Sequence, residues 1–359
     1  AARKYAAGDG WAAVNGHWSP LLPWLLAPWF KLGVPEILAL KITLLLGGLF
    51  AVVAFYRLSR RFEIEPRIRM WACLAFLPMA LYFSLVHCTP DVLMLGFMLG
   101  YLSVLFDRDF LRTRWGGAWC GVMAGLAYLS KSYALPFFCL HFPLVILLHA
   151  LRAEGAKPWK PAVARAAMGF ACIALIAASW IGVVSAKYGA FTLSKVASYN
   201  WSYSHPEAVD RMTLDLGLVP PASDRDISAW DDPPAPPVVR WSPFDSMKMF
   251  RQWLYMLARR AAKTALILET MSWLVIPVII LCLLGLWRHW RLWREKFHEY
   301  LPLLTVLSFP CGYILMWVVE RYLWLVTAIA LLLAAQALRG VLPRCRSQAW
   351  RRALSVLLA

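Results

Sequence analysis

The chain has 359 residues, 61% of them hydrophobic, and a formal net charge of +17. Apolar stretches of about twenty residues, the length that crosses a bilayer core, recur along it and exclude a soluble domain. The sequence therefore predicts an all-α polytopic membrane protein.

The positive charge is concentrated in five short segments, which argues against a nucleic-acid partner. They carry a net charge of +14 and comprise residues 57–69, 107–114, 151–165, 288–300 and 339–352. All five fall on one side of the predicted spans, as the positive-inside rule expects of cytoplasmic segments. We therefore interpret the charge as a signal of orientation in a lipid bilayer, with the N-terminus on the external side.

Nine transmembrane helices are predicted from the apolar runs. They cover about 36–56, 70–87, 92–106, 115–130, 133–150, 166–186, 270–287, 301–318 and 322–338. The run 92–106 is short for a span. Gly121 and Gly125 lie one helical turn apart, a spacing typical of close helix packing. Residues 353–359 are interpreted as the start of a further apolar helix, so we expect the chain to be part of a longer one.

The external segment 9–34 precedes the first of these spans. Ser19 and Pro20 predict a helix start, with Ser19 as the cap, and Gly33 predicts its end. Trp24 lies in this helix, which is too short to span the membrane, so we expect an interfacial helix on the external face.

One long external loop is predicted at 187–269, with ten basic and nine acidic residues. Its proline-rich part, 219–243, indicates an irregular lid or linker rather than a folded domain. Asp245 stands three residues after Ser242, which predicts a helix start with a capping box. The apolar and basic residues that follow predict an amphipathic helix on the outer leaflet.

Asp91, in Thr89-Pro90-Asp91, is the first candidate site residue. It follows a proline and begins an apolar run, so it fits a helix-start carboxylate that interacts with the helix dipole. It equally fits a carboxylate facing an external cavity, as a general base or as a group that positions an acceptor.

Basic residues at the same predicted face are the next candidates. Lys131 and Lys41 fit snorkelling side chains, or phosphate ligands for a lipid carrier. Glu320 and Arg321, followed by Tyr322, fit an ion pair that closes the last external turn. Alternatively, Arg321 grips a phosphate and Glu320 orients it.

A metal site is not visible in the sequence. The eight cysteines are scattered without ligand spacing, and no spacing links His17, His87 and His205. Asp9, between two glycines, fits a turn. No cofactor is predicted, although a divalent metal is compatible with the sequence.

Four motifs, in this order, resemble those of the GT-C polyprenyl-phosphate-dependent glycosyltransferases. The motifs are Asn15-Gly16-His17-Trp18-Ser19-Pro20-Leu21-Leu22-Pro23-Trp24-Leu25-Leu26, Thr89-Pro90-Asp91, Gly125-Leu126-Ala127-Tyr128-Leu129-Ser130-Lys131 and Glu320-Arg321-Tyr322. The protein O-mannosyltransferase-like and aminoarabinose-transferase-like membrane enzymes are the nearest group. The resemblance covers nearly the whole chain, residues 1–359, as one transmembrane domain.

The resemblance implies a sugar donor on a polyprenyl phosphate and a lipid, glycan or protein acceptor. It implies inverting transfer at the extracytoplasmic face, which would be the periplasmic side of a bacterial inner membrane. Asp91 matches the second acidic position of the family, and Lys131 matches the lysine near the carrier phosphate. The catalytic acid that normally follows the first span is expected upstream of Ala1.

Two other functions remain open from the sequence. A lipid transporter or flippase should have ionisable groups near mid-membrane and often a repeat between its halves. A non-catalytic membrane scaffold should tolerate the joint replacement of Asp91, Lys131 and Arg321. The clustering of charge at one face favours a reaction at that face over passage through the bilayer.

Overall fold

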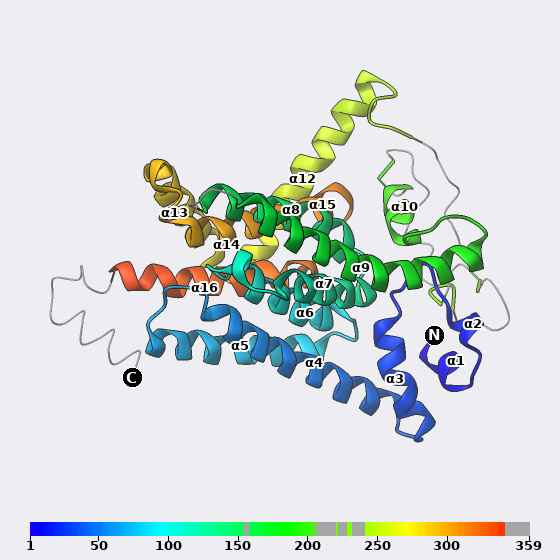
Figure 1. The fold of residues 1–359 in the computed structure, drawn as a ribbon. Coiled ribbons are helices and arrows are strands. Elements are labelled where there is room, and N and C mark those ends of the chain that lie inside the picture. The colour runs from blue at the N-terminus through cyan, green and yellow to red at the C-terminus, as the bar shows by residue number, and fades with distance from the viewer. Residues whose placement is uncertain (154–157, 203, 206–219, 222–227, 232–240, 342–359) are drawn as a thin grey trace.

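The computed structural model describes residues 1–341 apart from 154–157, 203, 206–219, 222–227 and 232–240. The described residues form helices without strands (Figure 1), as the all-α prediction requires. Most of the predicted lid, and the predicted helix start at 353–359, lie outside the described residues.

The helices follow the predicted apolar runs closely. In chain order they are α1 (Ala2–Ala6), α2 (Gly10–Ala13), α3 (Leu21–Lys31), α4 (Glu36–Ser59), α5 (Pro66–Val86), α6 (Asp91–Leu105), η1 (Phe110–Arg112), α7 (Gly116–Ser130), α8 (Ala134–Arg152), α9 (Trp159–Tyr188), α10 (Lys195–Ser202), α12 (Met247–Met271), α13 (Val275–Arg288), η2 (Trp290–Leu292), α14 (Phe297–Ser308), α15 (Cys311–Met316), η3 (Glu320–Leu323) and α16 (Trp324–Val341).

The structure supports a membrane-spanning bundle but does not confirm nine spans. Six stretches of the described chain are helical, long and apolar enough to cross a bilayer, and α12 with α13, bent by 112°, would make a seventh. The helices α6 and α7 have 15 residues each, or about 22 Å at 1.5 Å per residue, against a core of about 30 Å.

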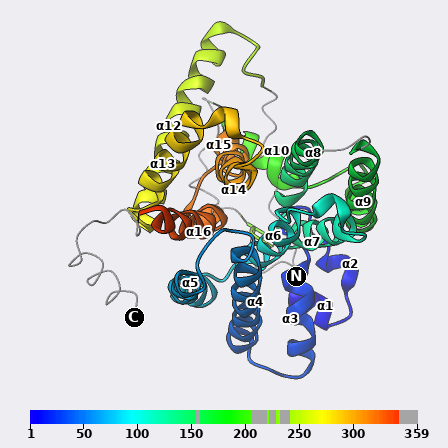
Figure 2. The ribbon, with the colours of Figure 1, turned by 60° about the vertical axis from the view of Figure 1, so that its left-hand side comes forward.

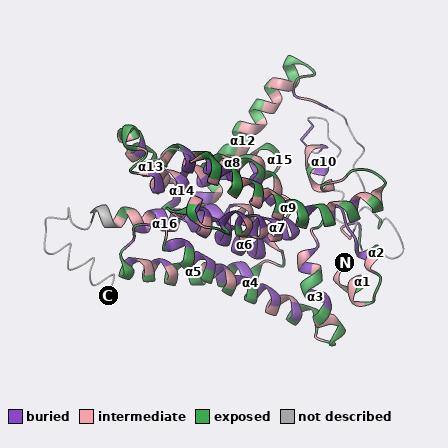
Figure 3. Cartoon of the chain, viewed as in Figure 1, coloured by how far each residue is buried: buried purple, intermediate pink, exposed green. Residues whose placement is uncertain are grey.

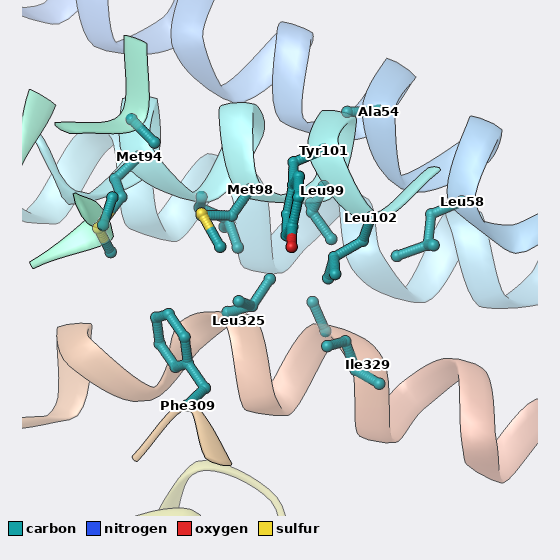
Figure 4. Packing of buried hydrophobic residues seen from close by; sticks show 14 of the residues in the cluster. Ala54, Leu58, Met94, Met98, Leu99, Tyr101, Leu102, Phe309, Leu325 and Ile329 are labelled. Carbon is teal, nitrogen blue, oxygen red and sulfur yellow. The ribbon is translucent and has the colours of Figure 1, made fainter. Parts of the chain in front are cut away.

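The short helix α6 lies at the centre of the bundle. Thirteen of its fifteen residues are buried, which fits a helix that is apolar all round. It packs against α4, α7 and α16. Figure 4 shows Met98 and Leu102 facing Leu325 and Ile329 of α16. Because α6 is enclosed, its first residue, Asp91, is held in a fixed position.

The outer helices direct apolar side chains away from this core. Leu46 and Leu49 of α4 are 58% and 60% exposed, and Leu140 and Leu175 on α8 and α9 are also exposed. Figure 3 shows these outward faces as exposed and the central helices as buried. Exposed apolar faces around a buried core are expected where lipid surrounds the protein.

Close packing of α7 on α9 agrees with the predicted glycine spacing. A Cβ atom at Gly121 would lie 2.2 Å from the carbonyl oxygen of Gly169, and one at Gly117 would lie 2.1 Å from that of Arg165. At Gly125 it would lie 2.8 Å from Ile176. Only glycine allows the two backbones to approach so closely.

The predicted cap of the first external helix is wrong. Helix α3 begins at Leu21, Pro20 occupies the N-cap, and no side chain caps the helix. Ser19 lies one residue before the N-cap position, which is too early for its hydroxyl to cap the helix. Pro20, at the N-cap, has no backbone N–H, so no hydrogen bond from that group is lost there. The predicted end is confirmed, because Gly33 has a φ of +73° just beyond the helix.

The predicted start of the amphipathic helix is too early. Helix α12 begins at Met247, and the hydroxyl of Ser246 accepts a hydrogen bond from the Met249 N–H at 3.1 Å. The Asp245 carboxylate does accept from the Ser242 N–H, at 2.7 Å, but this bond closes a turn before the helix. Figure 2 shows the N-terminal part of α12 extending beyond the other helices.

Two predicted spans are interrupted. The run 301–318 breaks after Ser308 into α14 and α15, and Pro310 is the N-cap of α15. The run 270–287 contains the sharp bend between α12 and α13. Proline cannot continue the hydrogen-bond ladder of the preceding helix, which accounts for the first break.

The described parts of four basic segments, 57–69, 107–114, 151–165 and 288–300, meet at one end of the bundle, called here the basic end. Arg61 pairs with Asp107 at 2.6 Å, and Arg108 pairs with Glu63. At this end Arg152 also donates to the carbonyl of Arg294, at 3.2 Å. The opposite end, called the site end, holds α3, α10 and the start of α6 (Figure 1).

Candidate functional site

Three charged residues far apart in the sequence meet at the site end. The side chain of Asp91 is 3% exposed, and Lys131 donates to its Oδ1 atom. Arg321 pairs with its Oδ2 atom, with an Nε–Oδ2 distance of 3.2 Å. Asp91 begins α6, Lys131 follows α7 and Arg321 lies in η3. One carboxylate and two cations leave the cluster a net charge of +1.

Local backbone structure explains two of these positions. Pro90 is the N-cap residue of α6, which places Asp91 in the first turn, where a carboxylate interacts favourably with the helix dipole. Lys131 is the C-cap residue of α7, where a cation is favoured for the same reason. The two helix ends therefore bring an anion and a cation to one point.

Tyrosine rings form the next layer around Lys131. Its Nζ atom lies 3.4 Å from the centroid of the Tyr322 ring, a cation–π contact. Tyr322 stacks on Tyr313 with 4.5 Å between centroids, and Tyr313 lies 3.8 Å from Tyr133. These rings restrict the lysine side chain and exclude water from one side of the cluster.

The remaining predicted site residues lie near the cluster but outside it. The structure has no ion pair between Glu320 and Arg321, because Arg321 is directed at Asp91 instead. Lys41 donates to the carbonyl of Leu85, and its Nζ atom lies 4.0 Å from the Cys88 sulfur. Lys41 is therefore placed at the α5–α6 turn that leads into Asp91.

Several buried polar atoms around the cluster have no hydrogen-bond partner within the described part of the chain. They are the Tyr313 hydroxyl, the Thr89 hydroxyl, His87 Nε2 and Trp324 Nε1. Each such group costs about 1–3 kcal/mol when buried and unpaired, so natural proteins rarely keep them without a use. Thr89 lies two residues before Asp91, and the Tyr313 ring stacks on Tyr322, so these two groups adjoin the cluster.

The tyrosine and tryptophan in this set were missed by sequence reasoning. Tyr313 and Trp324 lie in apolar runs, where an aromatic residue usually belongs to the core. Their nearness to the Glu320-Arg321-Tyr322 turn was the only available signal. Burial without a hydrogen-bond partner, which distinguishes them, is a tertiary property.

The Asn15-Gly16-His17-Trp18 motif joins the N-terminal segment to later helices. The Asn15 side chain accepts from the N–H groups of His17 and Trp18, at 2.7 and 2.9 Å. The Gly16 carbonyl accepts from the Lys195 N–H at 2.7 Å. A cavity of about 10 Å³ separates this motif from Ser132, the residue after Lys131. The motif therefore lies next to the segment that carries Lys131.

Asp9, His17 and His205 are not brought into the cluster. Asp9 caps α2 by accepting from the Ala12 N–H at 3.2 Å, as the turn interpretation expects. His17 packs against Tyr199 with 5.1 Å between ring centroids, and His205 packs against Trp241.

The described residues do not fit a metal centre. Among them, no group of three or more histidine, cysteine or acidic side chains is placed to hold an ion. Both oxygens of Asp91 are occupied by cationic side chains. We derive no step through a metal from this site.

Comparison with known proteins gives a match of fold. No protein-family model and no curated protein matches the chain. A similar solved structure is the archaeal oligosaccharyltransferase AglB from Archaeoglobus fulgidus, in complex with an inhibitory peptide and a dolichol-phosphate. The TM-score is 0.52 at 14% identity, and the match covers 95% of this chain but 46% of AglB, so the chain spans about half its length. At this identity the match shows a shared fold, which is in line with the resemblance read from the motifs.

Proposed function

We propose that this chain transfers a sugar from a polyprenyl-phosphate-linked donor to an acceptor at the site end. The observation that carries the proposal is Asp91, buried between Lys131 and Arg321. Ionisable residues in a membrane protein usually serve a substrate pathway rather than the fold. AglB, which shares the fold, was solved with a dolichol-phosphate and a peptide, which supports a lipid-linked donor.

The two cations suit the phosphate of such a donor. A guanidinium presents a fork of donors that matches phosphate oxygens, and an ammonium adds a compact charge. In the proposed complex, the donor phosphate draws Lys131 and Arg321 partly away from Asp91. Tyr322 keeps the lysine in reach through its ring contact.

The movement of Lys131 and Arg321 toward the phosphate also frees the carboxylate of Asp91. Once Lys131 has moved to the phosphate, Asp91 Oδ1 accepts the proton of the acceptor. The acceptor oxygen or nitrogen forms a bond to the anomeric carbon, and the bond from that carbon to the phosphate oxygen breaks. The electron pair leaves with the polyprenyl phosphate, and the two cations stabilise its charge. Attack opposite the leaving group inverts the anomeric carbon.

The outer residues complete the proposed site. Lys41, at the α5–α6 turn, adds positive charge toward the donor, and Glu320 interacts with the sugar or acceptor. The Tyr313 hydroxyl donates a hydrogen bond to the bound donor. The acceptor is a lipid, a glycan or a protein, and the reaction faces the periplasm of a bacterial inner membrane.

Sugar transfer from a labelled polyprenyl-phosphate donor tests the proposal. We expect Asp91→Asn to lower the transfer rate by about 10²–10⁴-fold, the usual contribution of a general base. Donor binding should persist or strengthen, because a competing carboxylate is lost. Asp109→Asn, at an exposed carboxylate of the basic end, is the matched control.

Two outcomes contradict the proposal. Undiminished transfer by Asp91→Asn would reduce Asp91 to a helix-start residue. Movement of the labelled donor across vesicle membranes by the wild-type protein, without a new glycosidic bond, would favour a flippase.

A further inference from the structure

We propose that a pocket at the basic end binds the phosphate headgroup of an anionic membrane lipid. The pocket has a volume of about 400 Å³. It is lined by Arg57, Arg60 and Arg61 at the end of α4, and by Ser103 and Val104 of α6. It lies at the opposite end of the bundle from Asp91, and is called here the arginine pocket.

One arginine forms a fixed wall of the pocket. Arg61 Nε donates to the Ser103 carbonyl at 2.7 Å, and its Nη1 atom lies 2.6 Å from Asp107 Oδ2. These two contacts join the ends of α4 and α6 and orient the guanidinium. Preorganised donors bind a ligand at lower entropic cost than freely moving ones.

The other two arginines are available to a ligand. Arg57 and Arg60 are exposed, and neither forms an ion pair with any described residue. With Arg61 and Asp107 included, the pocket carries a net charge of +2. Guanidinium groups bind phosphate oxygens in a bidentate manner, so this arrangement is selective for phosphate over a neutral headgroup.

Orientation and the helix dipole explain only part of this arrangement. The positive-inside rule and the negative C-terminal end of α4 both favour arginine here. Neither requires a cavity of about 400 Å³ or two arginines without carboxylate partners among the described residues. Basic pockets between transmembrane helices are a known setting for anionic lipid headgroups.

The surface next to the pocket favours a lipid over free phosphate. Leu46, Leu49 and Val53 are 58%, 60% and 48% exposed, and their spacing places them on the same face of α4 as Arg57. From Leu46 to Arg57 this apolar strip is about 16 Å long, close to half the thickness of a bilayer core. An acyl chain can lie along the strip while its phosphate occupies the pocket.

Native mass spectrometry of the detergent-purified chain with phosphatidylglycerol or phosphatidylcholine tests this assignment. We expect phosphatidylglycerol to bind the wild type more tightly than phosphatidylcholine. In Arg57→Gln/Arg60→Gln, phosphatidylglycerol affinity should fall about tenfold or more, because two charge-assisted contacts are lost. Arg288→Gln/Arg291→Gln, an exposed pair at the same end with the same loss of charge, should retain binding.

Further measurements distinguish lipid binding from the binding of free phosphate and from general charge attraction. Glycerol phosphate should compete only weakly with phosphatidylglycerol. Leu49→Ser/Val53→Ser should weaken the binding of phosphatidylglycerol and leave the binding of glycerol phosphate unchanged. Full competition by glycerol phosphate at equal concentration would overturn the lipid assignment. An equal loss of phosphatidylglycerol affinity in the Arg57/Arg60 variant and the Arg288/Arg291 variant would also overturn it, because it would indicate general charge attraction. The readout does not involve sugar transfer, so it is independent of the proposed function.

Discussion

Two buried polar clusters in this bundle differ in whether their hydrogen bonds are complete. In the first, His141 Nδ1 lies 2.9 Å from the Tyr101 hydroxyl, and Nε2 lies 2.9 Å from the Thr305 hydroxyl. Thr305 in turn donates to a helix carbonyl. In the second, around Asp91, charges are paired but several neighbouring polar atoms have no partner within the described chain.

We interpret the difference as that between a structural cluster and the proposed functional one. The His141 cluster joins α6, α8 and α14, and its groups are occupied by one another, so it specifies how these helices pack. A transporter would need ionisable groups near mid-membrane that a substrate can reach, and His141 is not such a group. The groups around Asp91 keep unused hydrogen-bonding capacity, which the proposed function assigns to the substrate.

The largest predicted effect comes from removing both cations of the Asp91 cluster. Lys131→Ala/Arg321→Ala should lose donor binding and about 3–5 kcal/mol of stability, because a buried carboxylate is left unpaired. Adding Asp91→Asn should restore most of the stability but not donor binding or transfer. Unfolding in detergent and donor binding, measured on both variants, check this. Full transfer by the triple variant would show that these three residues do not form the active site.

The second-largest effect is expected from removing the imidazole of the His141 cluster. His141→Leu should lower stability by about 1–3 kcal/mol, because the buried Tyr101 hydroxyl loses its partner and Thr305 loses one of two. Transfer per folded molecule should not change. Leu140→Ala, at a neighbouring residue that is 76% exposed, is the control and should alter neither quantity. A specific loss of transfer in His141→Leu would remove the distinction between the two clusters.

Tyr313→Phe should lower transfer without lowering stability, the opposite of His141→Leu. Its hydroxyl has no partner among the described residues, so stability should be unchanged or slightly higher. Transfer should fall about two- to tenfold, the value of one hydrogen bond to the donor. Tyr133→Phe is a matched control, because the Tyr133 hydroxyl donates to the Phe309 carbonyl and its loss should reduce stability. Equal transfer by wild type and Tyr313→Phe would refute a contact with substrate.

The smallest effect is expected at Lys41. Lys41→Met should weaken donor binding by less than about fivefold, because a partly exposed point charge contributes about 0.2–1 kcal/mol. Titration of the labelled donor measures it. A loss as large as that from Arg321→Ala would place Lys41 in the centre of the site.

The helix pattern was largely predictable, whereas the starts of two helices were not. The apolar runs predicted α4, α5, α8, α9 and α16, since bilayer thickness dictates the length and composition of spanning helices. The starts of α3 and α12 were misassigned because Ser19 and Ser242 are plausible caps in the sequence alone. The sharp bend between α12 and α13 likewise depends on packing, which local propensity does not contain.

The sequence by itself determined the membrane class, the sidedness of charge and the choice of Asp91, Lys131 and Arg321, since charged residues between apolar runs are costly and stand out. Only the tertiary structure brought these three into contact, across 40 and 190 residues of chain. It alone separated Tyr313 from ordinary core aromatics and gave the arginines at the end of α4 a pocket. Helix packing decides which side chains touch, which are buried and which polar groups find a hydrogen-bond partner. The identity of a single residue does not encode these properties.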